Sequence, residues 1–132
     1  MVIGADTGFF IELAKQNSTA QDIWEKVSNG DEELVVSVIS LNEIAVYFYR
    51  KGNIEDKDKL INLIKLMPNV ELIPVSVRIS EESAKYKHSL GIPTTDSLIL
   101  TTFILYGCKE VISTDKHFKK AEEQKLIKVK LI

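Results

Sequence analysis

The sequence predicts a three-layer α/β/α sandwich with a mainly parallel central sheet. Short apolar runs alternate along the chain with longer segments of helical period, which is the pattern of parallel strands joined by helical crossovers. The run 34–39 is rich in β-branched residues, as expected for a strand buried on both faces. No linker-like tract interrupts the 132 residues, so we expect a single domain over residues 1–132.

Each element has its own local signal. Glycine or proline residues close the predicted helices, at Gly30, Gly52, Pro68 and Gly91, because these residues favour helix ends. The predicted strands span residues 2–5, 34–39, 70–73, 110–113 and 127–131. The predicted helices span residues 7–14, 18–27, 40–52, 54–67, 76–90 and 95–106, and a short polar helix starts near residue 116.

Composition restricts the class of protein. A formal net charge of −2 gives no overall attraction to nucleic acid, so any such binding must be local. The single cysteine, Cys108, rules out an internal disulfide. The first residues lack the basic segment of a secretory signal, and the apolar run Leu98–Tyr106 is far shorter than the roughly 20 residues that span a bilayer. We therefore expect a cytoplasmic protein without a membrane segment.

Four carboxylates stand at comparable points of the pattern: Asp6, Glu43, Asp96 and Asp115 each lie where a strand-like run or a turn gives way to a helical run. In a parallel sheet the strand ends share one edge, where ligands bind. Each acid also has a local explanation as a helix cap, and Ser40 with Glu43 matches a capping box. A helix cap is needed only locally, at the start of any helix, so capping does not explain why the acids stand at equivalent positions along the chain. Their joint placement therefore favours a shared site.

Acids that converge in one pocket raise one another's pKa unless a counter-ion is present. The sequence offers no cysteine pair and no paired histidines for a softer metal. Hard oxygen ligands of this kind favour Mg²⁺ or Mn²⁺ over zinc. The acids therefore predict a divalent-metal site.

The segments around the four acids resemble a known family. Residues 3–7, 37–43, 93–99 and 111–118 are similar in order and spacing to the four acidic motifs of PIN-domain ribonucleases, and the chain has the size of VapC-type toxins of prokaryotic toxin–antitoxin pairs. One departure is Gly8, where the family often carries Ser or Asn.

The resemblance implies an endonuclease that cuts RNA with Mg²⁺ or Mn²⁺. It implies Asp6, Glu43, Asp96 and Asp115 as the catalytic and metal-binding acids, with Ser113 as an accompanying hydroxyl. The side chain missing at Gly8 would have to be replaced by Thr7 or by water. Water activated by metal would cleave to a 5′-phosphate and a 3′-hydroxyl. The resemblance also implies a small antitoxin partner and a homodimer.

Other functional residues are predicted from local pattern. Arg50, Lys51 and Lys116 are candidate phosphate contacts, although a solvated helix face of mixed charge is the simpler explanation for each patch. We expect His88 and His117 to have surface roles, because metal-activated water needs no histidine base.

Apolar residues surround the first predicted helix, namely Phe9, Phe10, Ile11 and Leu13. They favour a partner contact or ordinary core packing. A receiver-like signalling domain phosphorylated on Asp, and a PIN-like binding module without catalysis, are the alternative functions.

Overall fold

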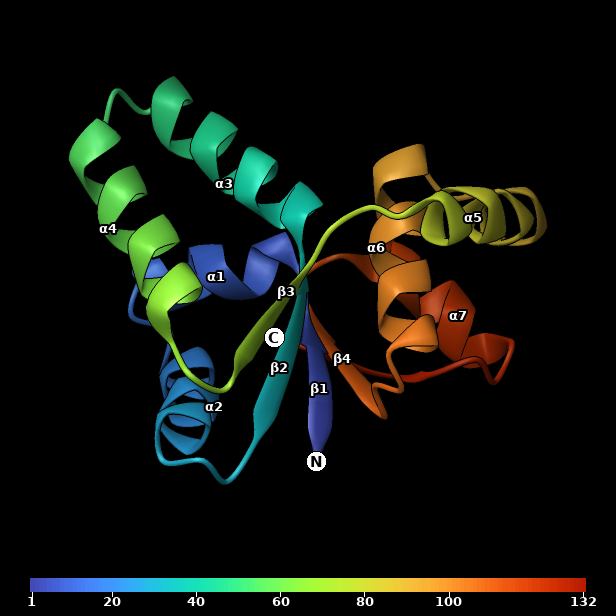
Figure 1. Ribbon diagram of the computed structural model, residues 1–132, viewed down its shortest axis with the longest axis horizontal. Coiled ribbons are helices and arrows are strands. Elements are labelled where there is room, and N and C mark those ends of the chain that lie inside the picture. The colour runs from blue at the N-terminus through green and yellow to red at the C-terminus, as the bar shows by residue number, and fades with distance from the viewer.

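The computed structural model describes residues 1–132, in which strands and helices alternate much as the sequence predicts (Figure 1). The strands are β1 (Val2–Ala5), β2 (Glu33–Ser37), β3 (Val70–Ile73), β4 (Glu110–Ser113) and β5 (Lys128–Leu131). The helices are α1 (Thr7–Ala14), α2 (Ser18–Ser28), α3 (Val38–Arg50), α4 (Ile54–Leu66), α5 (Val77–Leu90), α6 (Thr94–Leu105), the 3-10 turn η1 (Lys116–Phe118) and α7 (Lys119–Glu123). No helix has both the length and the apolar character needed to cross a bilayer.

The sheet is parallel at every pairing, in the order β3-β2-β1-β4-β5. The first strand is therefore central, and Gly4 stands opposite Val35 of β2 and Val111 of β4. A receiver-like domain has the strand order 2-1-3-4-5. The observed order excludes that alternative and leaves β1, β2 and β4 as the three central strands.

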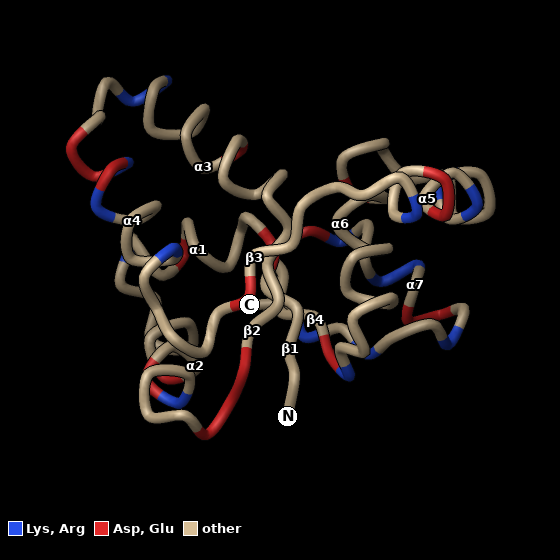
Figure 2. Tube along the Cα trace, in the orientation of Figure 1, with Lys and Arg blue, Asp and Glu red and all other residues tan.

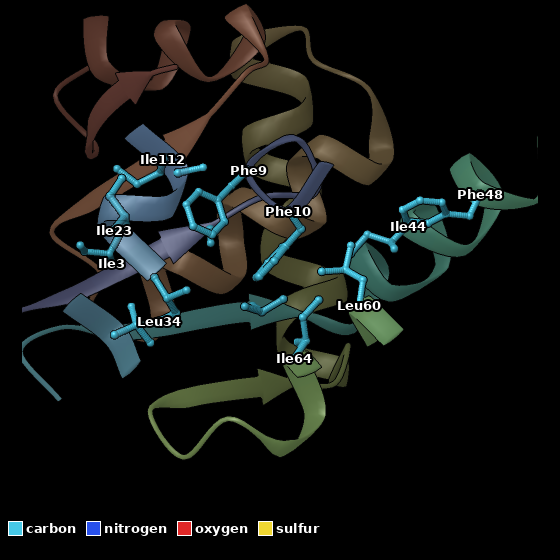
Figure 3. Packing of buried hydrophobic residues seen from close by; sticks show 14 residues of the cluster. Ile3, Phe9, Phe10, Ile23, Leu34, Ile44, Phe48, Leu60, Ile64 and Ile112 are labelled. Carbon is cyan, nitrogen blue, oxygen red and sulfur yellow. The ribbon is translucent and has the colours of Figure 1, made fainter. Parts of the chain in front are cut away.

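Two helical layers cover the sheet, as predicted: α1–α4 lie on one face and α5–α7 on the other (Figure 1). Side chains alternate between the two cores, because successive residues of a strand point to opposite faces. Leu34 and Val36 join the core under α1–α4, whereas Val35 joins the core under α5–α7. Figure 3 shows the first core, where Phe9 and Phe10 of α1 are completely buried.

Burial of both Phe9 and Phe10 favours core packing of α1 over a partner contact for these two residues. Their rings meet edge to face with centroids 5.1 Å apart, a favoured aromatic geometry. Ile11 and Leu13 are only partly buried. These two residues are the ones left with surface that a partner could cover.

The third helix starts earlier than predicted. Strand β2 ends at Ser37, and the Ser37 hydroxyl accepts a hydrogen bond from the Ile39 backbone N–H at 3.2 Å. Val38 and Ile39 are β-branched and favour strands locally, but this cap places them in the helix. Ser40 consequently lies inside α3 rather than at its start, so the predicted capping box with Glu43 is wrong.

Gly4 explains how closely the central strand approaches α6. A Cβ atom at Gly4 would stand 2.5–2.8 Å from three ring atoms of Phe103, a buried residue of α6. Ring and backbone are therefore in direct contact, which holds the helix carrying Asp96 against the strand that leads to Asp6. Only glycine permits this spacing.

We predict that Gly4→Ala lowers the free energy of unfolding by about 1–3 kcal/mol, the usual cost of overpacking a core. Urea denaturation followed by circular dichroism measures it. In a Phe103→Ala background, where the three ring atoms that meet Gly4 are absent, the same substitution should cost clearly less. Equal costs in the two backgrounds would contradict the role assigned to the Gly4–Phe103 contact.

Candidate acidic site

The ends of the two neighbouring strands β1 and β4 bring the first and last acids together. The Asp6 backbone N–H donates to the Ile112 carbonyl at 3.3 Å, so Asp6 lies beside Ser113. The Ser113 hydroxyl donates to Asp6 Oδ2 and accepts from the Asp115 backbone N–H at 2.8 Å. Ser113, which is completely buried, thus connects Asp6 to the loop that carries Asp115.

Asp6 is both a helix cap and part of this cluster. Its Oδ1 accepts the Phe9 backbone N–H at 3.0 Å at the start of α1, so the local explanation is correct but incomplete. The side chain is buried, and burial raises its pKa to about 6; hydrogen bonds from Ser113 and Phe9 oppose the rise, and the charges of Asp115 and Asp96 add to it. The ionised form of Asp6 is therefore disfavoured in the folded protein.

Asp96 comes from α6, on the other side of the sheet from α1. The cap of α6 is Pro93, without a side-chain hydrogen bond, so Asp96 is not an N-cap. Burial raises the pKa of Asp96 to about 6, a hydrogen bond from His117 opposes the rise, and the nearby Asp115 carboxylate contributes to it. Two raised carboxyl pKa values in one cluster are common at functional sites.

Asp115 caps η1 and also contacts a histidine. Its Oδ1 accepts the His117 backbone N–H at 2.9 Å. The His117 Nδ1 atom lies 2.8 Å from Asp96 Oδ2 and 3.2 Å from Asp115 Oδ1. His117 is exposed, as predicted, but its imidazole also directly contacts two of the acids.

Sequence reasoning missed His117 because its contact with Asp96 depends on how α6 packs against η1. The available signal was its position two residues after Asp115 in a turn. His88, by contrast, is exposed on α5, as predicted.

Glu43 reaches the site from α3, one turn after β2. Thr7 Oγ1 donates a hydrogen bond to Glu43 Oε1 at 2.7 Å and lies 3.0 Å from the Ser40 hydroxyl. Thr7 thus orients Glu43 across the space between α1 and α3. The Thr7 hydroxyl is therefore bonded to Glu43 and does not take the place of the side chain that Gly8 lacks.

All four acids line one pocket of about 130 Å³, without any Lys or Arg. Its lining residues are Asp6, Thr7, Gly8, Glu43, Asp96, Ile99, Thr114, Asp115 and Phe118. Carboxylate oxygens with hydroxyls nearby form a donor set that suits a hard divalent cation. The residues present therefore fit such an ion on chemical grounds.

The candidate phosphate contacts occupy different places. Arg50 and Lys51 line a second pocket of about 670 Å³, which shares Thr7 and Glu43 with the acidic pocket. Figure 2 shows this positive charge at the turn between α3 and α4. Lys116 is exposed on η1 and lines neither pocket.

Gly8 is explained by the neighbouring loop. A Cβ atom at Gly8 would overlap the Thr114 hydroxyl and stand 2.9 Å from Thr114 Cβ and 3.1 Å from Thr114 Cγ2. The side chain missing at residue 8 is thus matched by a side chain from residue 114, which lines the same pocket. The pocket keeps a hydroxyl group, supplied by the β4–η1 loop.

We predict opposite effects of Gly8→Ala in two backgrounds. In the natural sequence the clash with Thr114 should lower the free energy of unfolding by about 1–3 kcal/mol. In a Thr114→Gly background alanine should instead stabilise α1 by up to about 1 kcal/mol, because alanine favours helix over glycine. A urea double-mutant cycle measures both, and effects of the same sign and size would refute the steric pairing of residues 8 and 114.

Comparison with known proteins gives the same fold. Chains from three solved structures superpose over nearly their whole length: VapBC2 from Rickettsia felis bound to a DNA fragment from its promoter, VapC20 from Mycobacterium tuberculosis, described as a sarcin–ricin loop cleaving toxin, and VapBC-1 from nontypeable Haemophilus influenzae. Their TM-scores are 0.74, 0.72 and 0.68, at 14%, 16% and 21% sequence identity.

The coverage is nearly complete on both sides. The superpositions cover 100%, 90% and 98% of this chain and 99%, 94% and 97% of the respective neighbours. No curated protein matches the sequence. A family profile, that of the PIN domain, matches residues 4–124. With that match over most of its length and the PIN fold in its structure, the chain belongs to the PIN-domain family.

Proposed function

We propose that this PIN-domain protein is a divalent-metal-dependent endoribonuclease and the toxin of a toxin–antitoxin pair. The observation that carries the proposal is the convergence of Asp6, Glu43, Asp96 and Asp115 on one small pocket without a basic lining residue. Family membership supports a nuclease, and the similar VapBC and VapC structures support the toxin role. The alternative of a PIN-like module without catalysis predicts the same fold but no cleavage.

In the proposed site, Asp6, Asp96 and Asp115 would hold the cation, Mg²⁺ or Mn²⁺, and Glu43 of α3 would contribute the fourth carboxylate of the same pocket. When bound, the cation lowers the pKa of water and stabilises negative charge on the leaving oxygen. Ser113 fixes Asp6 and the Asp115 backbone in one arrangement, and Thr7 fixes Glu43. Because these hydrogen bonds already hold the acids in place, the acids would need little movement to bind the cation.

Arg50 and Lys51 lie where a phosphate backbone leaving the acidic pocket past Glu43 would pass. Positive charge there would bind RNA without reading its sequence, as in other single-strand binders. Lys51 also stands over the Tyr47 ring, 5.1 Å from its centroid, so Tyr47 helps to place that charge. Lys116 could contact phosphate only on the other side of the site, next to Asp115.

A groove between α1, α3 and α4 is the proposed contact for the antitoxin. It is lined on its apolar side by Leu13, Phe48, Leu60 and Leu63, and Leu63 is 41% exposed. Phe48 itself is buried, as expected of a core residue. An amphipathic helix from a small partner would cover such a surface, and a homodimer is the further proposed assembly.

We predict that Asp96→Asn and Glu43→Gln each reduce RNA cleavage at least about 100-fold, because each removes negative charge from the site while keeping side-chain shape. The assay is incubation of purified protein with a panel of RNAs in Mg²⁺ or Mn²⁺. Glu81→Gln, an exposed acid on α5, is the control and should cleave normally. Full activity of both site variants, with intact circular dichroism spectra, would overturn the proposed role of the acids.

The raised pKa of Asp6 predicts a pH-dependent stability of the metal-free protein. Burial raises the pKa of Asp6 from its ordinary value of 3.8 to about 6, so the penalty for ionising it is absent below about pH 4 and complete above about pH 6. We predict that Asp6→Asn raises the free energy of unfolding at pH 7 by roughly 1–3 kcal/mol. The gain should disappear at pH 4.

Urea denaturation of both proteins in EDTA, at pH 4 and pH 7, measures this difference. Adding Mn²⁺ at pH 7 should stabilise the natural protein more than Asp6→Asn, since the ion neutralises the buried carboxylate charge that the variant lacks. A variant that is less stable than the natural protein at both pH values would contradict the cost assigned to the ionised Asp6.

A further inference from the structure

We propose that His117 is a nitrogen ligand of the cation, together with Asp96 and Asp115, and that it makes this site favour Mn²⁺ over Mg²⁺. The inference rests on the proposed function and concerns the choice of ion at the same site. The sequence-based expectation involved oxygen ligands alone. An imidazole in the set changes the chemistry, because nitrogen ligands suit first-row transition metals whereas Mg²⁺ prefers oxygen.

The three side chains are already close enough to share an ion. One ligand atom from each of Asp96, Asp115 and His117 can be chosen so that all lie within 4.8 Å of one another. Neighbouring ligands of a six-coordinate ion, each about 2.1 Å from it, stand about 3 Å apart. The His117 Nδ1 atom is 2.8 Å from Asp96 Oδ2 and 3.2 Å from Asp115 Oδ1, so it stands at ligand spacing from both acids. As a ligand, Nδ1 would carry no proton, and the shared ion would replace its hydrogen bond to Asp96.

The chain around His117 holds the ring in this place. The next residue, Phe118, is buried with 1% exposure and fixes η1 in the core under α5–α7. The His117 backbone N–H is held by Asp115 Oδ1 at 2.9 Å. The ring is thus attached through the same loop that carries one of its partner ligands.

Exposure favours a ligand over a purely structural contact. The His117 side chain is 47% exposed and that of Asp96 only 14% exposed, so the ring contacts the buried carboxylate while part of it remains open to solvent. A histidine that served only as a counter-charge would have to leave when the ion arrived, and the two roles therefore predict opposite effects of its removal.

The sequence offers a matched control, because it contains only two histidines. His88 is exposed on α5, and only His117 is grouped with Asp96 and Asp115 as a possible metal ligand. Any nitrogen coupling of protein-bound Mn²⁺ from a histidine can therefore be assigned with His117→Gln and His88→Gln. Both substitutions replace the imidazole with a neutral amide that can still hydrogen bond, and both should preserve the fold.

The test combines binding and spectroscopy. Mn²⁺ and Mg²⁺ affinities are measured by calorimetry and by Mg²⁺ competition against the Mn²⁺ signal, and pulsed electron paramagnetic resonance detects ¹⁴N coupled to bound Mn²⁺. We expect ¹⁴N coupling in the natural protein and in His88→Gln but not in His117→Gln. Mn²⁺ affinity of His117→Gln should fall roughly 10- to 100-fold, as losses in a metal's ligand environment do, while Mg²⁺ affinity falls much less.

Two results would overturn the proposal: no ¹⁴N coupling in the natural protein, or a His117→Gln variant that binds Mn²⁺ as tightly as, or more tightly than, the natural protein. The second would mark His117 as a displaced counter-charge. His117→Ala, measured in parallel, excludes ligation by the introduced glutamine. RNA cleavage is scored separately, so a nuclease whose bound Mn²⁺ shows no ¹⁴N coupling refutes this inference alone, whereas coupling without cleavage refutes the proposed function alone.

Discussion

Burial of the Asp6 carboxyl group at the end of the central strand is the constraint on which the site depends. Two hydrogen bonds, from Ser113 and from the Phe9 backbone, and the N-terminus of α1 all favour its charged form. Burial outweighs them, since its pKa still rises to about 6. At neutral pH the folded chain therefore carries a costly negative charge that a bound cation would stabilise. The same residue that destabilises the metal-free protein prepares it for an ion.

Close approach of the backbone brings the other acids to Asp6. Gly4 lets the Phe103 ring lie on β1, which places α6 and hence Asp96 near the strand end. Gly8 lets Thr114 lie on α1, which places the loop with Asp115 there as well. Glu43 of α3 is held at the site by the hydrogen bond that it accepts from Thr7 of α1. In this account two glycines without special backbone angles matter because their missing side chains set distances between elements.

Much of the fold could be predicted from the sequence, because alternating apolar runs and Gly or Pro helix ends are local signals. The start of α3 could not be predicted in this way. Val38 and Ile39 are β-branched and favour strands, whereas in the structure they follow the Ser37 cap as the first residues of the helix. The four acids could be proposed as one site because parallel strands end at one edge. The contact between His117 and Asp96, and the space shared by Gly8 and Thr114, depend on tertiary packing, which no single-sequence pattern encodes.

End-group analysis of RNA cleaved by the purified protein tests the central claim most directly. The account predicts cleavage in Mg²⁺ or Mn²⁺ that stops in EDTA and leaves a 5′-phosphate and a 3′-hydroxyl, as expected when metal-activated water attacks phosphorus. Products that end in a 2′,3′-cyclic phosphate, or cleavage that continues in EDTA, would contradict it, because the ribose hydroxyl and a protein base would then perform the reaction without the acidic site.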